Sequence, residues 1–74
     1  MDDDSKLALQ LLAEQIKKRR KSLGLSQEKL AEKCGFDRTY ISLLERSARN
    51  PSYLNLKKLC NGLGISLSEL LSGL

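Results

Sequence analysis

One stretch of twenty residues constrains this chain more than any other, residues 27–46, which read QEKLAEKCGFDRTYISLLER. Ala31 stands at the offset where two helices joined by a tight turn come closest, so a longer side chain would push them apart. Gly35 falls in the turn, where a left-handed backbone favours glycine. Apolar residues that would anchor the two helices to a core lie on both of them: Leu30, Ile41 and Leu44. The stretch therefore predicts two short helices that cross at a tight turn.

Such a helix pair is typical of the helix-turn-helix, whose second helix lies in the major groove of DNA. The composition agrees, because 13 Lys and Arg residues against 9 Asp and Glu residues leave a formal charge of +4. A net positive charge favours a polyanionic partner. A chain of 74 residues has room for one domain with a small core, so we expect residues 1–74 to form a single domain.

The remaining pattern predicts five helices and no strand, an all-α fold. Residues that can cap a helix N-terminus recur along the chain: Ser5, Ser26, Asp37, Ser52 and Ser66. We expect helices from Ser5 to about residue 23, over 27–34, from 38 to 46 or 47, from Ser52 to Gly64, and a short one after Ser66. The fourth helix would bury Leu54 or Leu56. We expect residues 1–4 to fray.

Several classes of function lack the residues they need. The chain has two cysteines and no histidine, so the usual four-ligand zinc site cannot form and no metal or cofactor is expected. Cys34 and Cys60 stand at apolar helix positions, which indicates buried reduced thiols rather than a disulfide or a redox switch. No apolar run reaches membrane-spanning length, and the N-terminus is acidic, so we expect a cytoplasmic protein that is bound to the nucleoid. We expect no catalytic site and no small-molecule substrate.

Four motifs resemble one family of regulators. They are GLSQEKLA at residues 24–31, GFDRTYIS at 35–42, ERSARNPS at 45–52 and LGISLSELL at 63–71. Together they resemble the lambda repressor and Cro-like (XRE-type) helix-turn-helix family, and within it the controller proteins of restriction-modification systems. The resemblance implies a compact five-helix domain and a homodimeric transcription regulator on a palindromic operator, either a controller or a phage-type repressor. Two residues depart from the family pattern: Ser47 where Gly is common, and Leu43 where polar or small residues are usual.

The second helix of the pair is expected to read bases. With Ile41 and Leu44 inward at about 100° per residue, four side chains fall on the outward face, namely Arg38, Thr39, Ser42 and Leu43. Arg38 stands at the N-terminal end, which enters the groove deepest, and its guanidinium suits guanine O6 and N7. Leu43 would pack on a thymine methyl group or lean on a neighbouring side chain. The alternative for all four is a solvated helix face.

A second set is expected to bind phosphates, which position the protein without reading sequence. It comprises residues at two helix N-termini, in the loop after the reading helix and beside its inward face: Gln27, Tyr40, Arg46, Arg49, Asn50, Ser52 and Tyr53. Helix N-termini favour anions. For Tyr53 the alternative is a ring that covers the edge of the core.

Two further groups are structural. Arg20 should point inward, since it is three or four residues from Ile16 and Leu23, and Glu45 is its expected partner. The resemblance implies the same structural ion pair, whereas the alternative for Arg20 is a phosphate contact. The C-terminal segment holds more large apolar residues than its own core needs, so we expect a dimer interface from Leu67, Leu71 and Leu74, with Leu70 packed inward. The alternative is that all of them cover the monomer core.

A different class of function stays open from the sequence. An antitoxin or protein-interaction module of this fold would sequester a partner protein, although the chain has no room for an extra neutralising segment. RNA binding is less well supported, because three aromatic residues give no stacking platform.

Overall fold

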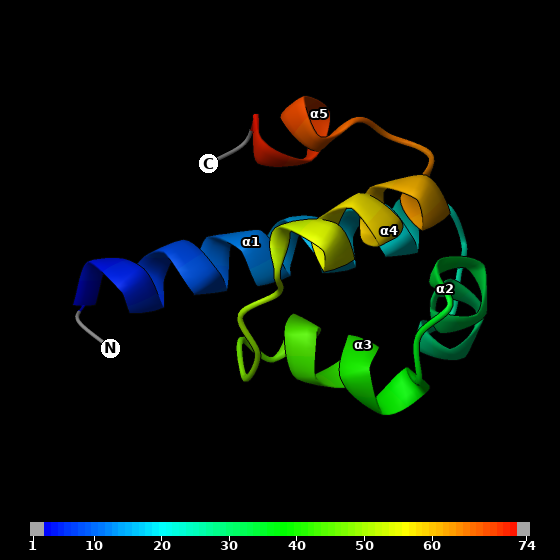
Figure 1. The fold of residues 1–74 in the computed structure, drawn as a ribbon, viewed down its shortest axis with the longest axis horizontal. Helices are drawn as coiled ribbons and strands as arrows, with labels where there is room; N and C mark the ends of the chain where they lie inside the picture. The colour runs from blue at the N-terminus through cyan, green and yellow to red at the C-terminus, as the bar shows by residue number, and fades with distance from the viewer. Residues whose placement is uncertain (1–2, 73–74) are drawn as a thin grey trace.

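The structure, a computed structural model, describes residues 3–72, which form five helices and no strand. They are α1 (Asp3–Ser22), α2 (Gln27–Cys34), α3 (Arg38–Glu45), α4 (Tyr53–Leu63) and α5 (Leu67–Leu71). The predicted all-α fold is confirmed. Figure 1 shows α1 running the length of the molecule, α2 at one end, α3 below α1 and α5 above α4. A helix of 20 residues is about 30 Å long, so α1 largely accounts for the longest dimension of 32 Å.

Serine caps begin three of the helices as predicted. The hydroxyls of Ser26, Ser52 and Ser66 accept hydrogen bonds from the backbone N–H groups of Lys29, Asn55 and Glu69 at 3.0–3.1 Å. Each bond satisfies an N–H group that the helix itself leaves unpaired.

Two other predicted caps differ. Asp37 occupies the position before α3 with an extended backbone, but its side chain makes no capping hydrogen bond. The prediction for Ser5 is wrong, because α1 is already helical at Asp3. Negative charge at a helix N-terminus is favourable, so Asp3 and Asp4 stabilise the first turn from within it.

The tight turn between α2 and α3 depends on Gly35, whose φ of 76° lies in the left-handed region as predicted. The following residue, Phe36, donates its N–H to the carbonyl of Ala31 at 2.9 Å. Ala31 itself is buried. A left-handed residue after a helix lets the chain reverse while the last carbonyls stay hydrogen-bonded. The turn therefore delivers α3 directly against α2.

The core lies between α1, α2, α3 and α4, and α5 closes it on one side. Its fully buried large side chains come from all five helices: Ile16, Leu30, Ile41, Leu59, Leu63 and Leu70. On α4, Leu56 packs against this core and Leu54 is 71% exposed, which decides between the two alternatives. Only the C-terminal part of α1 is packed, since Leu7 is 54% exposed.

Cys34 and Cys60 are buried free thiols, as predicted. Burial raises the pKa of both, so they remain protonated and unreactive at neutral pH. A Cβ at Gly62 would collide with the Cys34 sulfur. A glycine on α4 therefore allows α2 to approach it closely.

Candidate nucleic-acid interface

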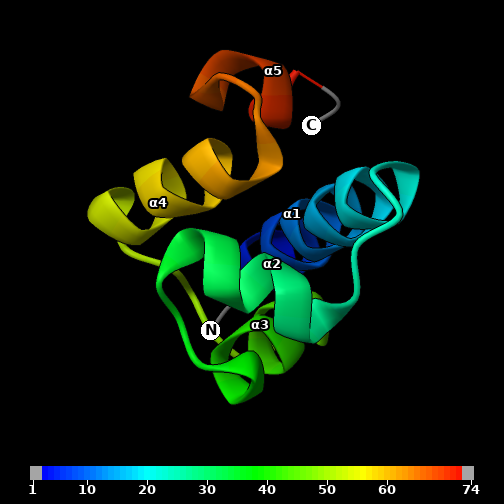
Figure 2. The ribbon, with the colours of Figure 1, turned by 90° about the vertical axis from the view of Figure 1, so that its right-hand side faces the viewer.

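The surface of α3 is divided between the core and solvent. Ile41 and Leu44 are buried, whereas Arg38 and Thr39 at the N-terminal end are exposed. Ser42 and Leu43, the other two predicted base-reading residues, are half-buried. Figure 2 looks onto the end of the molecule where α2 lies, with α3 beneath it. The arrangement leaves the N-terminal end of α3 open to a groove of DNA.

The Arg38 side chain makes no hydrogen bond or ion pair within residues 3–72. Its guanidinium therefore keeps all five N–H donors available for an external acceptor. Thr39 beside it is equally exposed. These two side chains are the most accessible of the predicted base-reading set.

Arg20 and Glu45 hold α1 against α3 from below the exposed surface. The Arg20 Nε and Nη2 atoms donate to the two Glu45 carboxylate oxygens at 2.6 and 2.9 Å. The remaining Arg20 nitrogen, Nη1, donates to the Leu25 carbonyl at 2.7 Å. Both side chains are buried, with 10% and 2% of their area exposed. The structure thus brings together the two residues that were expected to pair, and neither can reach a phosphate.

Gln27 takes part in the same network, which sequence reasoning missed. Its side-chain amide donates to Glu45 Oε1 at 3.2 Å. The expected phosphate contact therefore cannot come from that N–H without breaking the bond to Glu45. The backbone N–H of Gln27, in the first turn of α2, has no intrahelical acceptor and remains available for an anion.

Tyr40 is half-buried beside the exposed face of α3. Its ring lies 4.8 Å from that of Phe36, centroid to centroid, and its hydroxyl accepts a hydrogen bond from the Asn55 side chain at 2.9 Å. Because Asn55 occupies an acceptor position, the Tyr40 O–H proton is left to donate outward. Asn55 is a positioning residue that the helical pattern of α4 did not reveal.

The loop after α3 and the start of α4 carry the rest of the predicted phosphate set. Arg49, Asn50 and Ser52 are exposed, and Ser52 also caps α4. Arg46 is exposed, and its Nε donates to the Ser42 carbonyl at 3.3 Å. Tyr53 is 62% exposed, so its ring does not cover the edge of the core.

The C-terminal leucines divide between core and surface. Leu70 is buried as expected and Leu71 is 38% exposed. Leu67, expected at a dimer interface, is half-buried and packs against the core of its own chain. Leu74 lies outside the described residues.

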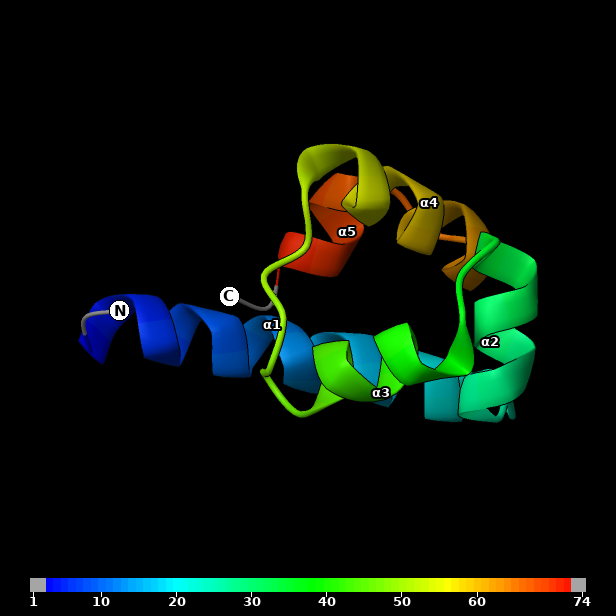
Figure 3. The same ribbon diagram turned by 60° about the horizontal axis from the view of Figure 1, so that its bottom comes forward.

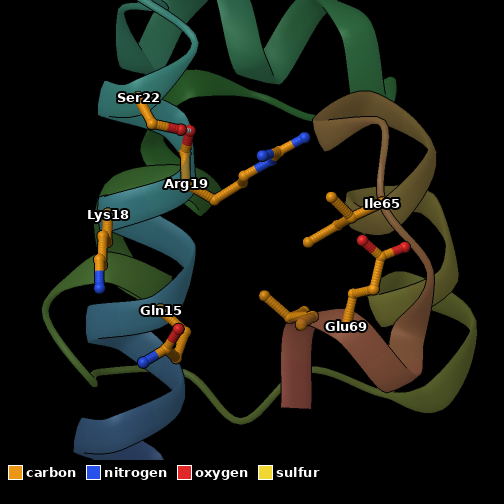
Figure 4. A pocket seen from close by; sticks show the side chains of 7 residues that line it. Gln15, Lys18, Arg19, Ser22, Ile65 and Glu69 are labelled. Atoms are coloured by element: carbon orange, nitrogen blue, oxygen red, sulfur yellow. Dashed lines mark hydrogen bonds between the residues drawn. The ribbon is translucent and has the colours of Figure 1, made fainter. Parts of the chain in front are cut away.

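The cationic run Lys17–Lys21 forms no single stripe. Lys17, Lys18 and Lys21 are exposed, while Arg19 donates through Nε to the Leu63 carbonyl at 3.3 Å. Arg19 also lines a hollow of about 240 Å³ together with Ile65 and Glu69. Figure 4 shows its side chain extending from α1 toward the turn that precedes Ile65. None of the predicted DNA-binding residues lines this hollow, which lies between α1 and α5. Arg19 therefore ties the helices together on a face apart from the candidate interface.

The described part of the chain holds neither a cluster of metal ligands nor a membrane-spanning helix. No group of three or more Cys, Asp or Glu side chains within residues 3–72 could hold a metal ion. None of the helices there combines the length and the apolar character needed to span a membrane.

Known proteins share the sequence pattern and the fold described above. A family model described as "Helix-turn-helix" (HTH_3) matches residues 16–70. Control protein C.MunI of Mycoplasma sp is 50% identical over 56 residues, which are 76% of this chain and 76% of that protein. Control protein C.SmaI of Serratia marcescens is 41% identical over 63 residues, 85% of this chain and 75% of that protein. Among solved structures, the restriction-modification controller protein C.AhdI from Aeromonas hydrophila superposes with a TM-score of 0.83 at 40% identity. The match covers 85% of this chain and 96% of that one.

Proposed function

The chain belongs to the helix-turn-helix family of DNA-binding transcription regulators, and from this we propose that it controls a restriction-modification system as a homodimer on a palindromic operator. It binds DNA and is not an enzyme, as its family is not. It acts where its operator is, on DNA in the cytoplasm. The control proteins named above support the choice of a controller over a phage-type repressor or an antitoxin.

The observation that carries the DNA-reading part is the exposed, unpartnered N-terminal end of α3. Arg38 and Thr39 are exposed to solvent, while Ile41 and Leu44, within the next two turns, are buried. A rigid helix with this division presents side chains to base edges without unfolding. We assign base reading to Arg38, Thr39, Ser42 and Leu43.

Phosphate binding is assigned to donors that surround this helix. They are the backbone N–H of Gln27, the Tyr40 hydroxyl that Asn55 positions, and the exposed groups after α3: Arg46, Arg49, Asn50, Ser52 and Tyr53. Contacts to phosphates fix register and orientation.

The homodimer rests on Leu71, a large apolar side chain left exposed on α5. An isologous interface through α5 repeats the reading helix by a two-fold axis, so the operator should contain inverted half-sites about 10 base pairs apart.

Selection of duplexes from a random library, followed by mobility-shift titration at two salt concentrations, tests these assignments together. We expect inverted repeats, two protein chains per duplex, and a log–log salt slope that steepens by about 0.9 for each phosphate neutralised. Binding without sequence preference and without salt dependence would exclude the DNA-reading assignment. A single asymmetric site with one chain bound would exclude the dimer alone.

Two arginine variants separate base reading from phosphate binding. Arg38→Ala should cost about 1–3 kcal/mol on the selected site and flatten the preference at one position of each half-site. Arg49→Ala should weaken binding to all sequences alike and make the salt slope shallower by about one unit. Equal losses for Arg38→Ala on selected and random DNA would remove Arg38 from the base-reading set.

The genes beside this one test the controller assignment. A neighbouring endonuclease or methyltransferase gene supports it, a prophage context favours a phage-type repressor, and a toxin gene favours an antitoxin.

A further inference from the structure

The N-terminal half of α1 extends past the rest of the molecule. Figures 1 and 3 show its first turns projecting beyond the other helices, on the side where the loop after α3 begins. Packing does not explain these turns, because residues 3–8 are all exposed. The helix continues for about two turns beyond the length that the core requires.

A hollow of about 280 Å³ lies between these turns and the end of α3. Five residues line it: Lys6, Leu9, Gln10, Arg46 and Ser47. Two of them are cations, one from each side, and Gln10 and Ser47 add uncharged hydrogen-bond donors. Leu9 supplies an apolar wall, and no carboxylate is among the lining residues.

Neither cation has an ion-pair partner among the described residues. The ion pairs within residues 3–72 are Arg20–Glu45 and Lys29–Glu32, so neither Lys6 nor Arg46 has a carboxylate partner there. The bond from Arg46 Nε to the Ser42 carbonyl directs its stem along α3 and leaves the two terminal nitrogens free. Two unpaired cations that face one hollow repel each other unless an anion lies between them.

The position of the hollow identifies the anion. When the N-terminal end of a reading helix enters the major groove, its C-terminal end approaches the sugar–phosphate backbone that borders the groove. Arg46 follows that end directly. Lys6 and Gln10, from a helix outside the helix-turn-helix, reach the same hollow.

We propose that Lys6 and Gln10 on α1, together with Arg46 and Ser47 after α3, bind one backbone phosphate diester of the DNA that flanks each half-site. The proposal rests on DNA binding through α3 and adds a contact from α1 that the helix-turn-helix itself does not supply. It gives the first turns of α1 a function, to lengthen the DNA footprint.

The primary test compares Lys6→Gln with Lys33→Gln, which makes the same charge change on an exposed lysine of α2 far from this hollow. On a duplex with several flanking base pairs, Lys6→Gln should lower affinity on the order of 5- to 10-fold at about 0.1 M salt and make the salt slope shallower by about 0.9. The loss should be the same for selected and random sequences. Equal affinity and slope for the two variants would overturn the proposal.

Neutral methylphosphonate linkages, placed one at a time along the duplex, locate the contact. At one flanking position we expect the substitution to weaken the wild-type protein and not to weaken Lys6→Gln any further. Additive losses at every position would assign the effect of Lys6 to general charge and overturn the proposal. A titration with inorganic phosphate tests whether the hollow is instead a site for a free anion. Inorganic phosphate would then bind the hollow in the absence of DNA, with an affinity equal to that of the DNA phosphate.

Single half-site duplexes keep this test independent of the proposed dimer. If the protein bound as a monomer to an asymmetric site, the affinities of Lys6→Gln and Lys33→Gln could still be compared on that site. Lys6 is exposed within a helix, so circular dichroism should show unchanged helix content and melting for both variants.

Discussion

Arg20 and Glu45 carry opposite charges into the interior, where each finds more than one partner. Arg20 uses three nitrogens on Glu45 and the Leu25 carbonyl, and Glu45 also accepts from Gln27. The hydrogen bond to Glu45 raises the pKa of Arg20, so the guanidinium stays charged at any pH at which the protein is studied. Burying a pair of charges is costly, and only complete pairing offsets the loss of hydration.

Removing one member of this pair should be severe. Glu45→Ala leaves a buried, uncompensated guanidinium, and we expect the free energy of unfolding to fall by about 3–5 kcal/mol. The total free energy of unfolding of a domain of this size is little more than that. Thermal circular dichroism should therefore find the variant unfolded or nearly so at room temperature. Gln27→Ala, which removes one outer hydrogen bond, should fold and melt a few degrees lower. A Glu45→Ala protein that melts within about two degrees of wild type would contradict the role assigned to the pair.

Ser47 is the only non-glycine residue with positive φ among residues 3–72, at 62°. The Ala48 N–H donates to the Leu43 carbonyl at 2.8 Å and the Ser47 N–H to that of Leu44 at 3.2 Å. This is the Schellman ending of a helix, in which glycine is preferred at the left-handed residue. The departure from the family pattern noted in the sequence therefore falls on a strained backbone position.

Replacing that residue should stabilise the domain. Ser47→Gly relieves the left-handed strain and should raise the free energy of unfolding by about 0.5–1 kcal/mol, a gain of a few degrees in Tm. Ser47→Ala keeps a Cβ and serves as the control, with no gain expected. Thermal melts without DNA make the comparison, and equal Tm values for the two variants would show that the strain is negligible.

At the scale of the elements, α5 is the shortest helix, with five residues and one buried side chain, Leu70. A capping box holds it: the Ser66 N–H donates to Glu69 Oε1, and the Glu69 N–H donates to the Ser66 hydroxyl, both at 3.1 Å. The backbone bond from Ser66 is the main reason that the pKa of Glu69 lies below its ordinary value of 4.5. A carboxylate whose pKa is lowered by folding stabilises the folded state at pH values above its ordinary pKa. This stabilisation is lost as the pH falls through the pKa that the group has in the folded protein.

The docking of α5 should therefore weaken in acid. At neutral pH, wild type should have a higher Tm than Glu69→Gln. The difference in Tm should narrow as the pH drops below about 4.5, because the side chain at this position is then uncharged in both proteins. Glu14→Gln, on an exposed position of α1, is the matched control. A gap for Glu69→Gln that stays constant between pH 7 and pH 3 would show that the charge of Glu69 does not support α5.

For the whole molecule, the separation of two surfaces matters most. The proposed reading helix α3 and the terminal helix α5 lie on different sides of α1 and α4 (Figure 1), so contacts through α5 would leave α3 uncovered. A domain of 74 residues buries a small core, and the proposed pairing with a second copy would add both stability and a second reading helix.

A charge on α5 tests the pairing. Leu71→Asp should move the protein from dimer to monomer in sedimentation velocity, keep most of its helix content and sharply weaken operator binding. Leu7→Asp alters an exposed leucine on α1, 54% exposed against 38% for Leu71, and should leave the dimer intact. A wild-type protein that is monomeric at high micromolar concentration, and that binds DNA one chain at a time, would rule out the interface.

Local spacing in the sequence determined the helices, their serine caps and the turn at Gly35, because these depend on hydrogen bonds between residues three to five apart. The buried stripe of each short helix and the inward position of Arg20 follow from the same period. Even the strained position of Ser47 was marked in the sequence, by a residue that stands where glycine is common in the family that the chain resembles.

Only the tertiary structure decided where the helices cross. The crossing points in turn decided the partners of the side chains that lie between elements. The amide of Gln27 turns to Glu45, Asn55 holds the Tyr40 hydroxyl, and Leu67, expected at a dimer interface, packs partly against the core. The hollow shared by Lys6 and Arg46, forty residues apart, belongs to the same class. Such contacts depend on the angle and offset between helices, which packing of the whole core sets and no local pattern encodes.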